Sequence, residues 1–324
     1  MTKMRVALGL GGELADTDLV FASQMGCSGI VHHVPALPGE GRWEASDLLA
    51  LRRRVESFGL RLESIENTPW PFYEPAMLGA ENAAQCINDY ARTVRNIGEA
   101  GIPVLGFCWM PNIIEPRLFQ TAYDTRGRAG SMVRSFEMGL VEDSVSHGRP
   151  YPAEEMWNNF ERFMEVVLPA AESAGVRLAL HPDDPPMPEL GGIARIFRGN
   201  AGFRRAIETY DSPNFGLNFC LGTWSEMDED AVENLRFFAE RQKVVYLHFR
   251  DVKGKVPSFE ECYLGEGNVN LAAAIRVLRD SGFEGFMEND HVPAMVEDSP
   301  FGHRSRALAT GYILGLINGV TATA

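Results

Sequence analysis

The chain has 324 residues, of which 45% are hydrophobic and 23% are charged. This composition is that of an ordinary globular protein, and it excludes a disordered, collagen-like or coiled-coil chain. The formal charge is −14 at pH 7, because 44 Asp and Glu residues outnumber 30 Lys and Arg residues. A chain this acidic repels phosphate backbones and anionic lipid, so we expect neither nucleic acid nor membrane as a partner.

The cysteines and the N-terminal segment indicate a cytoplasmic protein. Five cysteines are scattered along the chain without a Cys-x-x-Cys pair. An odd number in a large chain argues against a disulfide framework and favours a reducing compartment. The first residues lead straight into a strand-like segment without a signal-peptide layout, and no apolar stretch approaches the ~20 residues of a membrane span.

Short apolar runs alternate with longer amphipathic stretches along the chain. The apolar runs are typical of buried strands and cover residues 5–10, 29–34, 62–67, 103–108, 176–181, 215–220, 244–249 and 285–289. The stretches between them have helical spacing, and several end at a glycine, a common helix C-cap. Examples of the expected helices are residues 46–58, 80–100, 153–174, 200–209, 228–241 and 271–281.

Eight strand-and-helix units predict an α/β fold, a (β/α)₈ TIM barrel formed as one domain by residues 1–324. A doubly wound sheet would need a glycine-rich phosphate turn after the first strand, and residues 9–12 do not fit that motif. One connection, about residues 110–152, is too long for an ordinary loop. Because it follows the fourth strand, we expect it to form a lid-like insertion over the active site.

Four consecutive strands of this barrel end in residue types that bind metal ions. His181 ends the fifth strand, Cys220 the sixth and His248 the seventh, and Asp290 follows the eighth. Each residue alone is more often part of the core, but the strand ends of a barrel converge on one mouth. The four together therefore predict a metal centre, and this mixed donor set can hold Zn²⁺, Fe²⁺ or Mn²⁺.

Other polar residues at the strand ends are candidates for catalysis or substrate binding. His291 is a candidate acid or base, since imidazole titrates near neutrality, although a solvated loop histidine is the alternative. His33, one of a neighbouring pair of which only one faces the interior, and Asn67 could bind substrate hydroxyls. Arg250 lies on the same side of its strand as His248 and could anchor a carboxylate, or form a salt bridge in the outer layer.

Two further segments have more than one interpretation. Asp183 and Asp184, in the segment His-Pro-Asp-Asp-Pro-Pro, could orient His181, bind substrate hydroxyls or cap the next element. The basic segment 126–134, which ends at Arg134, could close over an anionic substrate or be a solvated loop.

In these motifs the sequence resembles the mannonate dehydratase family, metal-dependent sugar-acid dehydratases with a xylose-isomerase-like barrel. Residues 181–186 match a specific motif of that family, residues 217–223 resemble its cysteine-ligand segment, and residues 247–253 are similar to its His-Leu-Arg-Asn-Val segment. The resemblance implies a divalent ion, usually Mn²⁺, an acid or base role for His291, and a homo-oligomer. The implied ligands of the ion are His181, Cys220, His248 and Asp290.

The chain departs from the family pattern after the eighth strand. The family motif Pro-Asp-His-Gly-Arg is replaced here by Asn-Asp-His-Val-Pro at residues 289–293, so its arginine is missing. A family catalytic tyrosine is absent from residues 300–308. The second acid or base could then be His303, Tyr263 or a metal-bound water, and Arg304 could bind the carboxylate in place of Arg250.

These residues predict a hydro-lyase that converts a sugar acid such as D-mannonate to a 2-keto-3-deoxy acid and water. Removal of the C2 proton requires a stabilised enediolate, which a bound metal ion provides electrostatically. The main alternative is a sugar or sugar-acid isomerase or epimerase on the same barrel, which needs no acid for a leaving group. A non-catalytic carbohydrate-binding relative is a third possibility, against which the four-ligand set argues.

Overall fold

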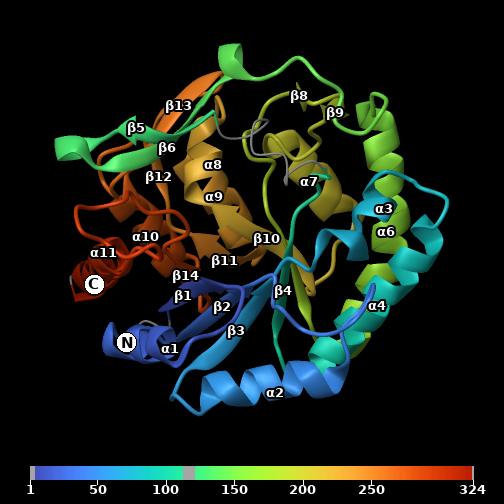
Figure 1. The fold of residues 1–324 in the computed structure, drawn as a ribbon, viewed down its shortest axis with the longest axis horizontal. Helices are drawn as coiled ribbons and strands as arrows, with labels where there is room; N and C mark the ends of the chain where they lie inside the picture. Colours follow the sequence, from blue (N-terminus) through green and yellow to red (C-terminus); the bar gives the residue numbers. More distant parts are fainter. Residues whose placement is uncertain (1–3, 112–120, 323–324) are drawn as a thin grey trace.

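The computed structural model describes residues 4–111 and 121–322, and within them eight parallel strands close into a barrel (Figure 1). Their order around the barrel is β1-β14-β11-β10-β7-β4-β3-β2. Each strand lies within about two residues of its predicted position, so the predicted TIM barrel is confirmed. The strands are β1 (Arg5–Gly11), β2 (Gly29–His33), β3 (Arg61–Glu66), β4 (Val104–Phe107), β7 (Arg177–Leu180), β10 (Phe215–Cys220), β11 (Val244–His248) and β14 (Phe286–Glu288).

Most helices cover the outside of the barrel and bury one apolar face (Figure 1). In α4 (Ala83–Glu99), Ile87, Tyr90, Val94 and Ile97 recur every three or four residues and are buried. The others are α1 (Asp16–Gln24), α2 (Ala45–Glu56), α3 (Glu74–Met77), α6 (Ala153–Ala174), α7 (Asn200–Thr209), α8 (Leu221–Glu226), α9 (Ala231–Glu240), α10 (Leu271–Asp280) and α11 (His303–Ala322). No helix of the described residues is both long and apolar enough to cross a membrane.

Part of the predicted insertion forms regular structure. Strands β5 (Ala122–Arg126) and β6 (Met132–Glu137) form a hairpin that pairs with a second hairpin, β12 (Asp251–Lys255) and β13 (Ser258–Cys262). The four strands make an antiparallel sheet, here called the cap sheet, in the order β12-β13-β6-β5 (Figure 1). Residues 112–120 of the insertion lie outside the described residues.

The cap sheet has its own small core and is joined to the barrel. The rings of Phe136 and Phe259 stack with centroids 5.6 Å apart. The backbone of Met132 on β6 pairs with Ala294, at N–O distances of 3.1 and 2.8 Å. This pairing ties the cap sheet to the segment that follows β14 and carries Asp290 and His291.

Short elements complete the connections between the main strands and helices. A two-stranded sheet follows β7, and three 3₁₀ turns lie among the described residues between β3 and α6. Their bounds are β8 (Glu189–Leu190), β9 (Ile193–Ala194), η1 (Trp70–Phe72), η2 (Arg128–Gly130) and η3 (Met138–Leu140).

Candidate metal centre

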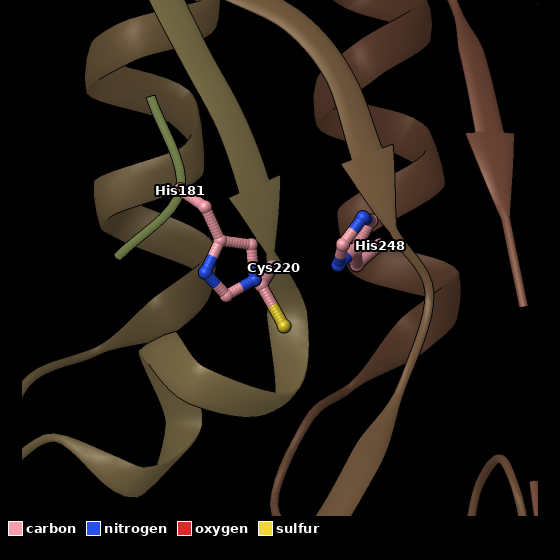
Figure 2. A group of neighbouring side chains, drawn as sticks. All are labelled: His181, Cys220 and His248. Carbon is pink, nitrogen blue, oxygen red and sulfur yellow. The ribbon is translucent and has the colours of Figure 1, made fainter. Parts of the chain in front are cut away.

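Three of the four predicted metal ligands converge where neighbouring strands end. His181 follows β7 directly, Cys220 ends β10 and His248 ends β11, and these strands are adjacent in the barrel. One possible ligand atom of each lies within 4.8 Å of the other two. Figure 2 shows the His181 ring and the Cys220 sulfur turned toward His248. The common direction of parallel strands produces this convergence from residues far apart in the chain.

Neighbouring groups orient both imidazoles toward the same point. His248 Nε2 lies 2.9 Å from a Glu66 oxygen and 2.8 Å from a Glu288 oxygen, so Nε2 carries the proton. The buried His248 Nδ1 has no hydrogen-bond partner within the described residues. His181 Nδ1 lies 2.7 Å from the Pro182 carbonyl oxygen and donates to it, which leaves Nε2 unprotonated. Each ring therefore offers one lone pair, as metal-binding histidines do.

Cys220 is held as a thiolate. Burial raises the pKa of its thiol, but the Arg250 charge and the neighbouring His181 and His248 side chains outweigh burial and lower the pKa to about 5. The Thr223 hydroxyl and backbone N–H, at the start of α8, also donate to the sulfur at 3.2 and 3.5 Å. The thiolate is the form of cysteine that binds metal ions.

Asp290 lies at the edge of this cluster. Its Oδ2 is 3.5 Å from His248 Nδ1. Burial raises the pKa of its carboxyl group, but His291, His248 and Arg250 outweigh burial and hold the pKa well below its usual range. Two imidazole nitrogens, a thiolate and a carboxylate thus fit a divalent transition-metal ion, whereas Mg²⁺ would require oxygen ligands.

A cavity of about 180 Å³ adjoins the cluster and is lined by strand ends and the cap sheet. The predicted substrate residues His33, Asn67 and Arg134 line it, as does the acid or base candidate His291. The lining residues are His33, Glu66, Asn67, Cys108, Met110, Arg134, His181, Asp184, His248, Asp290 and His291.

The two neighbouring histidines of β2 have different surroundings. His32 Nε2 donates to the Gly12 carbonyl oxygen at 2.9 Å, and burial lowers the pKa of His32 to about 4. His33 lines the cavity and lies 3.3 Å from Glu288 and 3.6 Å from Glu66. Burial lowers the pKa of His33, but these two carboxylates outweigh burial and raise it to about 9. His33 is therefore a charged proton donor in the cavity.

The structure separates the two neighbouring aspartates of the His-Pro-Asp-Asp-Pro-Pro segment. Asp184 lines the cavity, whereas Asp183, the predicted substrate residue, is buried outside the lining. Asp183 accepts a hydrogen bond from the Phe197 backbone N–H at 2.6 Å and lies 3.8 Å from Arg195. Its position supports the interpretation that Asp183 caps the element that follows it in the chain. It does not favour a role for Asp183 in binding substrate hydroxyls.

Arg250 is buried among carboxylates instead of lining the cavity within the described residues. Its guanidinium lies 2.8 Å from Asp184, 2.9 Å from Glu226 and 3.3 Å from Glu261. These contacts favour the salt-bridge interpretation of Arg250 over a role as substrate anchor.

His303 and Arg304 are not brought to the cavity. His303 begins α11 and lies 2.6 Å from the Ser299 hydroxyl and 3.1 Å from Asp18. The exposed Arg304 donates to the Val296 carbonyl oxygen at 3.0 Å. Neither residue belongs to the lining described above.

Sequence reasoning missed two carboxylates that orient the site, Glu66 and Glu288. Both lie in apolar barrel strands, where an unpaired glutamate would be costly. That mismatch was a usable signal, but the strand-end rule selected the neighbouring Asn67 and Asp290. Gly9 makes room for these groups, because a Cβ at this position would overlap the Glu288 carboxylate and lie 2.8 Å from His33 Nε2.

Comparisons with known proteins agree with the fold. The family model D-mannonate dehydratase (UxuA) matches residues 4–149 and 146–324. The mannonate dehydratase of Streptococcus equi subsp. zooepidemicus is 29% identical, over 90% of this chain and 87% of that protein. The crystal structure of mannonate dehydratase from Streptococcus suis serotype 2 has a TM-score of 0.90 at 26% identity, covering 100% of this chain and 95% of that chain.

A more distant match bears on the fold alone. A xylose isomerase domain protein from Planctomyces limnophilus has a TM-score of 0.62 at 15% identity, covering 98% of this chain and 99% of that chain. The barrel is therefore xylose-isomerase-like, as expected. Because the family model spans nearly the whole sequence, the chain belongs to the D-mannonate dehydratase family.

Proposed function

We propose that the protein is a metal-dependent hydro-lyase that converts a D-mannonate-like aldonate to a 2-keto-3-deoxy acid and water. The observation that carries this proposal is the cavity that adjoins the cluster of His181, Cys220 and His248 and is lined by Asp290, Arg134, His291 and His33. Such a cavity joins a site for a divalent ion to a cationic anchor and two groups that transfer protons.

His181 Nε2, Cys220 Sγ, His248 Nδ1 and the Asp290 carboxylate are the groups that would hold the ion. Mn²⁺ is the ion we propose, with Fe²⁺ and Zn²⁺ as alternatives, because all three accept nitrogen, sulfur and oxygen ligands. When bound, the ion would supply Lewis acidity to oxygens at C1 or C2 of the substrate.

The remaining steps belong to side chains that line the cavity. Arg134 binds the substrate carboxylate, since a guanidinium matches a carboxylate with two parallel hydrogen bonds. His291 accepts the C2 proton, and the C3 hydroxyl leaves with a proton from His33. The enol that forms then tautomerises to the 2-keto acid, so one water is released for each aldonate consumed.

A reducing cytoplasm suits this centre. All five cysteines are free, and the proposed ion depends on Cys220 as a reduced thiolate. We propose this location together with the homo-oligomer that the family resemblance implies.

The test is a metal-reconstitution assay on a panel of aldonates. Purified protein is stripped with a chelator, reloaded with Mn²⁺, Fe²⁺ or Zn²⁺, and incubated with D-mannonate and its stereoisomers while 2-keto-3-deoxy acid is measured. We expect metal-dependent keto acid from D-mannonate, and loss of both bound metal and activity in Cys220→Ala. Cys86→Ala, at a partly exposed cysteine of α4, is the matched control and should retain both.

Two outcomes would contradict the proposal. Metal-loaded protein that forms no keto acid from any aldonate would exclude a dehydratase of these acids. Interconversion of neutral sugars by the same preparation would favour the isomerase or epimerase alternative.

A further inference from the structure

The cap sheet places a buried carboxylate against the proposed base. Glu261 on β13 is 6% exposed, and its Oε1 lies 2.5 Å from His291 Nδ1. This contact joins residues 30 positions apart in the chain, one in the cap sheet and one in the segment after β14. The sequence motifs assigned no role to Glu261.

The contact determines which nitrogen of His291 carries a proton. Arg250 Nη1 lies 3.3 Å from Glu261 Oε1 and 3.1 Å from His291 Nδ1, and Arg134 Nη1 lies 3.3 Å from Nδ1. Glu261 Oε1 is the nearest of these groups to Nδ1, so Nδ1 donates to it and Nε2 keeps its lone pair. Arg134 Nη1 lies 2.8 Å from Nε2 and donates to it, as this tautomer requires.

The surroundings of His291 explain why a partner is needed. His291 lies between β14 and α11, in a segment that has no helix or strand of its own to hold the ring. A group that removes a proton from carbon must present its lone pair in a fixed direction, since small misalignments cost large factors in rate. A carboxylate on the far nitrogen of an imidazole supplies this orientation in other proton-transfer sites.

We propose that Glu261 is a positioning residue that holds His291 in the Nδ1–H tautomer with Nε2 aimed at the substrate. The cap sheet is then part of the catalytic apparatus as well as a cover, because its β13 strand supplies this carboxylate. The kinetic part of this inference rests on the proposed dehydratase function, whereas the tautomer and orientation of His291 do not.

The kinetic test compares three variants of neighbouring carboxylates in the metal-loaded enzyme. Glu261→Ala should lower kcat roughly 10- to 100-fold, the effect typical of losing a supporting hydrogen bond at a site, while KM stays within about twofold. Glu261→Gln, which still accepts a hydrogen bond, should restore part of the loss. Glu260→Ala is the control, since Glu260 is the half-buried neighbour on the same strand and should leave kinetics unchanged.

A deuterium isotope effect separates positioning from a merely structural role. With substrate deuterated at C2, Glu261→Ala should show a larger isotope effect on kcat than the wild type, because proton abstraction becomes slower. Glu226→Gln removes the charge of another carboxylate that pairs with Arg250 and should leave the isotope effect unchanged. An unaltered isotope effect in Glu261→Ala, with metal content intact, would overturn the proposal.

An NMR measurement tests the inference without any activity. Histidine ¹⁵N spectra of the Zn²⁺-loaded protein should show His291 protonated at Nδ1, with its proton shifted strongly downfield, and Glu261→Gln should abolish that shift. If wild-type His291 is instead protonated at Nε2 alone, the proposal is wrong even if the enzyme is active. If the tautomer is as expected but no aldonate is dehydrated, the proposed function fails and the positioning of His291 by Glu261 stands.

Discussion

Arg134 is the cationic side chain that the cap sheet contributes to the cavity. Its guanidinium donates to His291 Nε2 at 2.8 Å. A substrate carboxylate offers two charged acceptors in place of one neutral nitrogen, so substrate binding should draw Arg134 away from His291. The exchange would anchor the substrate and free the base in the same movement.

Replacing Arg134 should therefore weaken substrate binding. A hydrogen bond to a charged group contributes about 1.5–3 kcal/mol, so Arg134→Gln should raise KM for an aldonate by roughly 10- to 100-fold. Arg126→Gln is the matched control, because the exposed Arg126 donates within its own hairpin, to the Gly130 carbonyl oxygen at 3.2 Å. Steady-state kinetics of both variants measure KM for the aldonate. An unchanged KM in Arg134→Gln would mean that another residue anchors the substrate carboxylate.

Part of the site could be predicted from the sequence by one rule, namely that the strands of a barrel all end at the same mouth. This rule brought together His181, Cys220 and His248, since each position follows from the end of a strand alone. It does not apply to His303 and Arg304, which were chosen from the departure from the family pattern and whose positions depend on the path of the irregular segment before α11. The contact of Glu261 with His291 depends on how the cap sheet docks, which no local pattern encodes.

At the level of elements, helix packing gives two glycines opposite roles. Gly98 lies in α4 against the end of α6, and an added Cβ would be 2.5 Å from the Ala174 carbonyl oxygen. Gly315 lies on the exposed face of α11, where no heavy atom of the described residues lies within 4 Å of an added Cβ apart from its own helix. The same substitution should therefore have opposite effects at the two sites.

Gly315→Ala should stabilise the protein and Gly98→Ala should destabilise it. Alanine favours a helix over glycine by about 0.8–1 kcal/mol, so Gly315→Ala should raise the free energy of unfolding by up to that amount. At Gly98 the overlap is with backbone, and overpacking costs about 1–3 kcal/mol, which outweighs the helix preference. Urea unfolding midpoints of the two variants test this, and a shift of the same sign in both would contradict the packing argument.

The elements themselves differ in how well the sequence predicted them. The barrel strands are continuous apolar runs because both of their faces are buried, and such runs are visible without a structure. The β12–β13 hairpin was missed, since five of its twelve residues 251–262 are charged and few of its side chains, Val252, Val256 and Phe259, join the apolar cluster of the cap sheet. Its stability comes from pairing with β6, a partner more than 100 residues away.

At the scale of the whole molecule, the metal centre should couple to folding. The barrel mouth gathers Glu66, Glu288 and Asp290 around His248 in a chain of net charge −14. Crowded carboxylates and a thiolate repel one another, and a divalent cation relieves that repulsion in the folded state alone. Ligand residues from three separate strands cannot form the same site in the unfolded chain.

Metal binding should therefore raise the melting temperature in proportion to the logarithm of metal concentration. A site occupied at 100 times its Kd adds about 2.7 kcal/mol to the free energy of unfolding. Calorimetric scans of chelated protein titrated with Mn²⁺ should show this rise, and Mg²⁺ should give a smaller one because a thiolate is a poor ligand for it. Cys220→Ala should lose most of the rise while Cys86→Ala keeps it. An equal rise in both variants would mean that the stabilising ion binds elsewhere than at the strand ends.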